Sequence, residues 1–197
     1  SDFRYGYPAV DLQSDGLTFV NEAEIRGTGI YHTDLNSDGY MAPVYAGAVV
    51  IRADDITIVN SDGATILGLD EAIAVPHVST PNGPLGQGLV VDNSGLIQAT
   101  EGSAIHSNAG FEVTNRTGGL IAARLIALHA PNSNATVVNA GTISSETEHA
   151  IVTNILFLEN SGTIDGGIAA GHSISKITNH GVITGGYSAY GGLILIN

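Results

Sequence analysis

The stretch Val91-Asp92-Asn93-Ser94-Gly95-Leu96-Ile97 decides the fold, because its pattern recurs along most of the chain. Apolar residues alternate with other residues before Asn93, which is typical of a strand with one buried face. Asn93 and Gly95 favour a sharp corner, since both residue types tolerate left-handed backbone conformations. Ile97 then starts a second strand that points back into the core. The repeating unit is therefore a strand, a corner and a second strand.

Copies of this unit align on a set of asparagines along the chain. The aligned residues are Asn21, Asn60, Asn93, Asn115, Asn139, Asn160, Asn179 and Asn197. The residue two positions before each of them is apolar. From Asn93 onward the asparagines are spaced by about 18 to 24 residues, which matches one turn of a β-helix. Asparagines stacked at one corner would hydrogen-bond along the axis and satisfy backbone groups left open by the bend.

We predict a single all-β domain over residues 1–197, a right-handed parallel β-helix of about eight rungs. The right-handed coil follows from the strong preference of parallel crossover connections for that hand. A second recurring element predicts another strand that faces the first two across the core. It occurs at Gly29-Ile30, Ala72-Ile73, Ala104-Ile105, Leu125-Ile126, Ala150-Ile151 and Gly167-Ile168.

Composition restricts the partners and the chemistry. The net charge is −13, with only six Lys and Arg residues, so nucleic acids and anionic membrane surfaces are disfavoured. The absence of cysteine excludes disulfides, thiolate metal sites and cysteine nucleophiles. The most apolar stretch, residues 119–130, is interrupted by Arg124 and is too short to insert into a membrane.

Two insertions, residues 31–46 and 75–88, lengthen the repeat. Repeat proteins commonly carry function in such insertions. Equal positions in neighbouring rungs stack, so we expect both insertions to leave the same edge of the coil and to lie together. This edge is the best candidate for a functional site.

The first insertion contains the oxygen-rich run Asp34-Leu35-Asn36-Ser37-Asp38-Gly39-Tyr40. Calcium prefers several oxygen ligands on a short loop in which glycine makes the bend, so Asp34, Asn36, Asp38 and Tyr40 form a candidate Ca²⁺ site. Tyr45 stands where an EF-hand places its bidentate glutamate, so the site is incomplete or of another type. The alternative is a polar turn. Residues 11–16 are a weaker echo of the same pattern.

Most of the histidines fall near the corner after the second strand: His32, His77, His106, His129, His149 and His172. Stacked histidines would bind a transition metal or act as acid–base groups. Their offsets from the neighbouring isoleucines vary, so they need not share one direction, and solvated turn residues are the alternative. If the protein is an enzyme, the best catalytic candidates are His32, His77, Asp34 and Asp38.

The rungs at residues 93–97, 139–143 and 160–164 resemble the Asn-x-Gly-x-Ile rungs of autotransporter passenger domains and related secreted bacterial adhesins. The resemblance extends roughly from Leu17 to Asn197. It implies a protein that is secreted or displayed on the surface of a Gram-negative bacterium. The two long insertions depart from a simple passenger stalk.

Three functions remain open. The first is a structural or adhesive module that presents its insertions to a carbohydrate or cell-surface ligand, with Ca²⁺ ordering the first loop; the lack of a catalytic motif favours it. The second is a polysaccharide lyase, hydrolase or epimerase, since right-handed β-helices often host these activities. A strongly negative protein would repel an acidic polymer. The third is the N-terminal product of a self-processing protein, because asparagine can attack its own carbonyl, here at Asn197.

The last residues, 193–197, match the opening of another rung. We therefore expect a fragment of a longer protein. Its apolar end would contact the remainder of that protein end to end.

Overall fold

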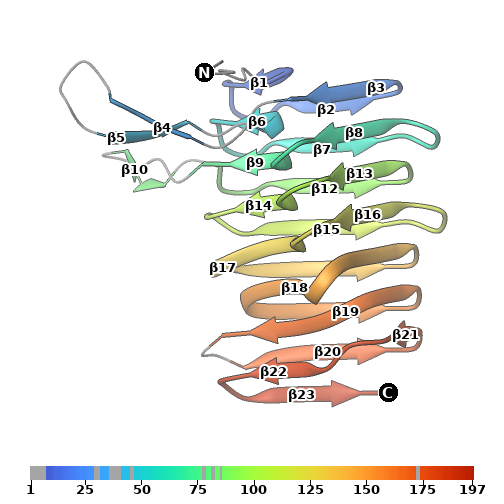
Figure 1. The fold of residues 1–197 in the computed structure, drawn as a ribbon. Helices are drawn as coiled ribbons and strands as arrows, with labels where there is room; N and C mark the ends of the chain where they lie inside the picture. Colours follow the sequence, from blue (N-terminus) through green and yellow to red (C-terminus); the bar gives the residue numbers. More distant parts are fainter. Residues whose placement is uncertain are drawn as a thin grey trace.

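The computed structural model describes residues 8–28, 32–35, 41–44, 47–76, 79–80, 83–84, 86–171 and 174–197. These residues form a right-handed parallel β-helix, as predicted, and nineteen of the strands belong to one continuous sheet. Figure 1 shows the rungs stacked along one axis, from the N-terminal rung at the top to β23 at the bottom. Within the described part of the chain every regular element is a strand.

Each complete rung contributes three strand positions. The first position is occupied by β2 (Thr18–Asn21), β7 (Thr57–Asn60), β12 (Val90–Asn93), β15 (Phe111–Asn115), the ends of β17 (Ile126–Asn139) and β18 (Thr142–Asn160), β20 (Ser175–Asn179) and β23 (Leu193–Ile196). The second position is occupied by β3 (Glu24–Gly27), β8 (Thr65–Gly68), β13 (Leu96–Ala99), β16 (Leu120–Ala123), the starts of β18 and β19 (Thr163–Ala170), and β21 (Val182–Ile183).

The third position completes the coil. It is occupied by β1 (Val10–Leu12), β6 (Gly47–Ile51), β9 (Glu71–Val75), β14 (Ser103–Ser107), the start of β17, the middle of β18, the end of β19, and β22 (Tyr187–Ala189). The same register repeats from rung to rung, so similar side chains lie above one another. Ile97, for example, lies between Ile66 and Ile121, and all three are fully buried.

The asparagines form a continuous buried ladder at the corner between the first and second strands. The side-chain amide of each asparagine donates to the carbonyl oxygen of the next, at 2.7 to 2.8 Å, from Asn21 to Asn179. The same amides also donate to backbone carbonyls of the following rung, such as Asn60 to Leu96 at 3.1 Å. The predicted structural role of these asparagines is confirmed, because the amides satisfy carbonyls that the bend leaves open.

The predicted third strand is right in part of the chain and wrong in two rungs. Ile105 pairs with Ile73 and with Leu128, so Leu128 takes the place that the sequence pattern assigned to Ile126. In the N-terminal rungs the third strand is β6, where Val49 pairs with Ile73, and the predicted Gly29-Ile30 lies outside the described residues. The number of residues between the second and third strands varies, and this variation obscures the periodic pattern.

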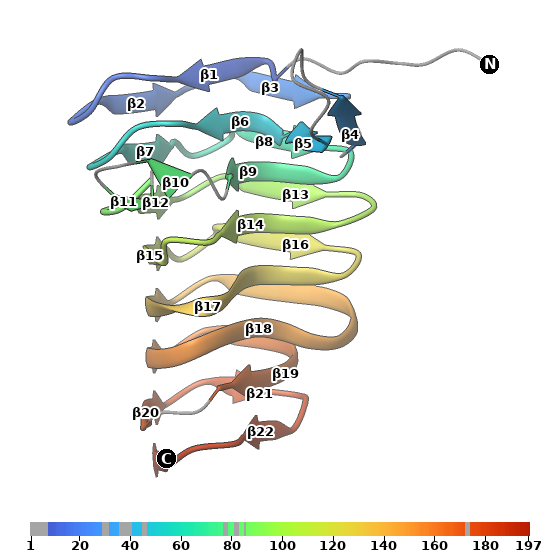
Figure 2. The same ribbon diagram turned by 90° about the vertical axis from the view of Figure 1, so that its left-hand side faces the viewer.

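The two insertions flank the third strands at opposite ends. The first joins β3 to β6 and contains the antiparallel pair β4 (His32–Leu35) and β5 (Met41–Val44). The second joins β9 to β12 and contains the antiparallel pair β10 (Ser79–Thr80) and β11 (Gly83–Pro84). Both hairpins project from the side of the coil that carries the third strands (Figure 1). Figure 2 shows one hairpin near each end of these strands.

The first insertion precedes the third strand of its rung, whereas the second follows the third strand. That the insertions at 31–46 and 75–88 share one edge stays a prediction.

Candidate functional site

The predicted calcium residues lie in and after β4. Asp34 belongs to that strand, where its backbone is paired with Ala42. Asn36, Asp38 and Tyr40 are outside the described residues and belong to the segment that joins β4 to β5. The Ca²⁺ site remains a prediction. Among the enzyme candidates, His32 opens β4 opposite Val44, and His77 lies outside the described residues.

The weaker Asp-rich echo at residues 11–16 is a polar corner. Asp15 accepts a hydrogen bond from the backbone N–H of Asp54 at 2.8 Å, and Asp54 accepts one from the backbone N–H of Gln87 at 3.0 Å. Gly16 has a φ of 71°, as a tight turn requires. These carboxylates connect successive rungs, so the arrangement matches the polar-turn alternative.

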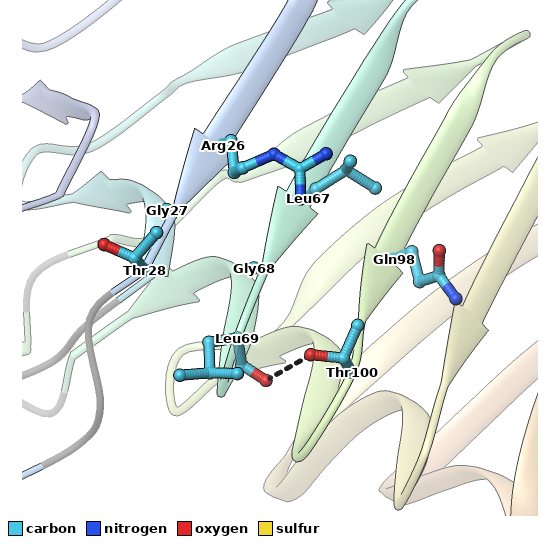
Figure 3. Close-up of a pocket in the computed structure, with 8 residues that line it drawn as sticks. All are labelled: Arg26, Gly27, Thr28, Leu67, Gly68, Leu69, Gln98 and Thr100. Atoms are coloured by element: carbon cyan, nitrogen blue, oxygen red, sulfur yellow. Dashed lines mark hydrogen bonds between the residues drawn. The ribbon is translucent and has the colours of Figure 1, made fainter.

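An open pocket of about 660 Å³ lies where the second strands of the N-terminal rungs end (Figure 3). Arg26, Leu67 and Gln98 occupy equivalent positions on β3, β8 and β13 and point outward into it. Thr100 lies at its lower end and donates a long hydrogen bond, 3.4 Å, to the carbonyl of Leu69. The pocket thus offers one guanidinium group, one amide and the hydroxyl groups of Thr28 and Thr100 beside aliphatic side chains.

One residue that lines this pocket, Gly68, approaches the backbone of Glu71 so closely that only glycine fits there. A Cβ added at Gly68 would lie 1.8 Å from the carbonyl oxygen of Glu71, a backbone atom that cannot move aside. At this rung, the turn from β8 to β9 therefore leaves no room for a side chain at position 68.

A smaller pocket of about 360 Å³ adjoins the first and shares Gln98 and Thr100 with it. Its other lining groups include Arg124, Ser144 and Asp165. Arg124 forms an exposed ion pair with Glu101 at 3.2 Å. Together the two pockets make a depression of mixed polar and apolar lining that follows the coil axis; we call it the corner groove.

A second cluster lies on the outward face of the third strands. His106 on β14 and His129 on β17 are register partners, and their rings stack with centroids 4.9 Å apart and planes 28° apart. Glu71, at the start of β9, places its Oε1 against Nδ1 of His106. The side chains of Glu71 and His106 are 10% and 19% exposed.

Burial controls the electrostatics of this cluster. Burial first, and the neighbouring His106 second, lower the pKa of His129 to about 4. His129 is therefore uncharged at neutral pH. Glu71 Oε2 is buried and has no hydrogen-bond partner within the described part of the molecule.

Apolar residues bound the cluster along the column. Ala74 precedes His106, and Val152 follows His129. Ala74 and Val50 are fully buried and form a small cluster separate from the main core. The cluster is therefore a pair of imidazoles held between apolar neighbours.

The sequence contains a pattern that predicts this pair, but the alignment of the third strands placed it at the wrong residues. The dipeptides Ile105-His106 and Leu128-His129 are equivalent, whereas the predicted element at Leu125-Ile126 assigned His129 a different offset. His149 lies opposite Gly167, away from the pair, and His172 is outside the described residues. Across the described ranges, no three His, Asp or Glu side chains lie close enough together to hold a metal ion by themselves.

The fold defines the chain as a parallel β-helix. Comparisons with protein-family models, characterised proteins and solved structures found no match. None of the described residues forms a helix that could span a membrane.

Proposed function

We propose that this chain is a structural or adhesive module, secreted or displayed on the surface of a Gram-negative bacterium, that binds a carbohydrate or cell-surface ligand. The observation that carries the proposal is the unbroken asparagine ladder from Asn21 to Asn179. A coil in which every corner is bonded to the next is stiff, and a stiff coil suits the display of a binding surface at a distance. The resemblance of the rungs to autotransporter passenger domains supports the same function.

The binding surface that we propose comprises the hairpins and the corner groove. The hairpins project from the N-terminal rungs, and the groove begins at Arg26 on β3. Its guanidinium, amide and hydroxyl groups are donors and acceptors of the kind that hold sugar hydroxyls. Because the net charge is −13, neutral glycans are favoured over acidic ones.

Calcium enters this proposal through the first hairpin. The run from Asp34 to Tyr40 includes the segment that joins β4 to β5, a position where a bound cation would hold the hairpin in one conformation. We therefore expect Ca²⁺ to strengthen ligand binding.

The test is binding of the whole chain to neutral and acidic glycans and to cells, with Ca²⁺ or with a chelator. Gln98→Ala should weaken binding at least fivefold because it removes a groove amide. Thr178→Ala, an outward residue on the distant strand β20, is the matched control and should bind like the wild type.

Two outcomes would decide against the proposal. If neither glycans nor cells are bound, the adhesive function is wrong. Release of unsaturated sugars or new reducing ends from the same glycans would instead favour the polysaccharide lyase, hydrolase or epimerase alternative.

A further inference from the structure

We propose that His106 and His129 together bind one divalent transition-metal ion, such as Zn²⁺ or Cu²⁺, with Glu71 orienting His106. This site is separate from the corner groove and from the predicted calcium loop. Imidazole nitrogen is a preferred ligand of both ions, whereas Ca²⁺ prefers oxygen.

The contact between Glu71 and His106 leaves Nε2 of His106 as the first metal ligand. A carboxylate that accepts a hydrogen bond from Nδ1 holds the ring proton on that nitrogen and leaves the lone pair of Nε2 free for a metal. Carboxylate–histidine–metal arrangements of this kind are common around zinc. Glu71 is nine-tenths buried, so its position is fixed by packing, and its second oxygen still has acceptor capacity.

The neighbouring ring of His129 supplies the second ligand, because His106 and His129 are register partners on adjacent strands. Two nitrogens bound to the same ion at about 2.0 to 2.1 Å in tetrahedral geometry lie roughly 3.4 Å apart. In the stack, with centroids 4.9 Å apart and planes 28° apart, the in-plane lone pairs run roughly parallel, so both rings must rotate before their nitrogens converge on one ion.

Within the described part of the chain, the site has two protein ligands. Ala74 and Val152 bound the pair along the column, and neither has a side chain that can ligate a metal. The partial exposure of His106 leaves room for water, which would complete the coordination. The site would therefore bind an exchangeable ion.

The first test adds substoichiometric CuCl₂ to the wild-type chain while the histidine ring signals are observed by NMR. Paramagnetic Cu²⁺ should broaden the signals of His106 and His129 before those of the other histidines. Broadening that begins at other histidines, or that affects all of them equally, would overturn the proposal. This measurement needs no substitution, so it does not depend on a variant folding.

The second test measures ZnCl₂ affinity by calorimetry for the wild type and for variants. His106→Gln and His129→Gln should each weaken binding at least tenfold, and Glu71→Gln should weaken it about tenfold, as loss of an orienting carboxylate does. His180→Gln, at an exposed turn after β20, is the control and should leave the affinity unchanged. Unchanged affinity in both ring variants would show that zinc binds elsewhere.

Discussion

At the scale of single residues, the buried asparagines hold the corners of the coil. Asn115 is fully buried and bonds to four groups: it accepts from Asn93 and donates to Asn139, Gly119 and Thr142. A buried polar group without a partner costs more than its hydrogen bond contributes. Each rung therefore depends on the asparagines above and below it.

We predict that Asn115→Ala lowers the free energy of unfolding by about 3 kcal/mol. The substitution removes the amide that donates to the side-chain carbonyl of Asn139 and to the backbone carbonyl of Thr142. Urea denaturation followed by circular dichroism would measure the loss. Asn179→Ala is the control: Asn179 lies at the far end of the ladder and is partly exposed, so its loss should cost about 1 kcal/mol or less. Equal losses at both positions would contradict the ladder model.

The pH dependence of stability at His129 is a second prediction at this scale. Burial lowers its pKa from 6.5 to about 4, so the unfolded chain binds a proton at His129 in a range where the folded chain does not. The contribution of uncharged His129 to the free energy of unfolding is complete above pH 6.5 and declines as the pH falls from 6.5 to about 4. Since the side chain is partly exposed, we expect a loss on the order of 1 kcal/mol.

This loss is measurable by urea denaturation in the presence of a chelator at several pH values from 7 to 4. The titratable groups that face His129 are His106 and, beyond it, Glu71, and both are retained in the comparison. His129→Gln should flatten the pH dependence, whereas the exposed control His180→Gln should not. An identical pH profile in wild type and His129→Gln would rule out this assignment.

At the scale of elements, the connection from the second to the third strand is the variable part of each rung. The N-terminal rung places the first hairpin there, whereas β8 turns directly into β9 through Gly68. The close approach of Gly68 to the backbone of Glu71 makes this turn tight and also positions the carboxylate that contacts His106.

We predict that Gly68→Ala destabilises the protein by about 3 kcal/mol, because a Cβ there collides with backbone atoms 1.8 and 2.2 Å away. Thermal unfolding would show the effect. Gly186→Ala is the matched control, since a Cβ at that position has no atom within 4 Å, and it should change stability by less than about 0.5 kcal/mol. If Gly68→Ala is as stable as the control, the turn is more adaptable than its geometry indicates.

At the scale of the whole molecule, acidic residues far outnumber basic ones. The chain has 19 Asp and Glu residues against six Lys and Arg residues. The ion pairs that the basic residues make, such as Arg116 with Asp92 and Arg26 with Glu24, are on the surface and contribute little. Net repulsion therefore acts on the whole coil.

We predict that sodium chloride raises the melting temperature, because added ions screen repulsion over a Debye length of about 10 Å at 0.1 M and about 3 Å at 1 M. Differential scanning calorimetry from low to high salt would measure the shift, and an uncharged osmolyte would serve as the control for solvent effects. A melting temperature that falls with salt would mean that attractive ion pairs outweigh the repulsion.

The sequence by itself determined the coil, the first two strands of each rung and the asparagine ladder. These features repeat with similar spacing, so a pattern in one rung predicts the residue stacked above it. Only the tertiary structure decided which residues form the third strands at β6 and at the start of β17, that the insertions flank opposite ends of the third strands, and that Glu71 meets the pair of His106 and His129. The physical reason is that the connection before the third strand varies in length, so equivalent residues there are set by packing and hydrogen bonding between rungs.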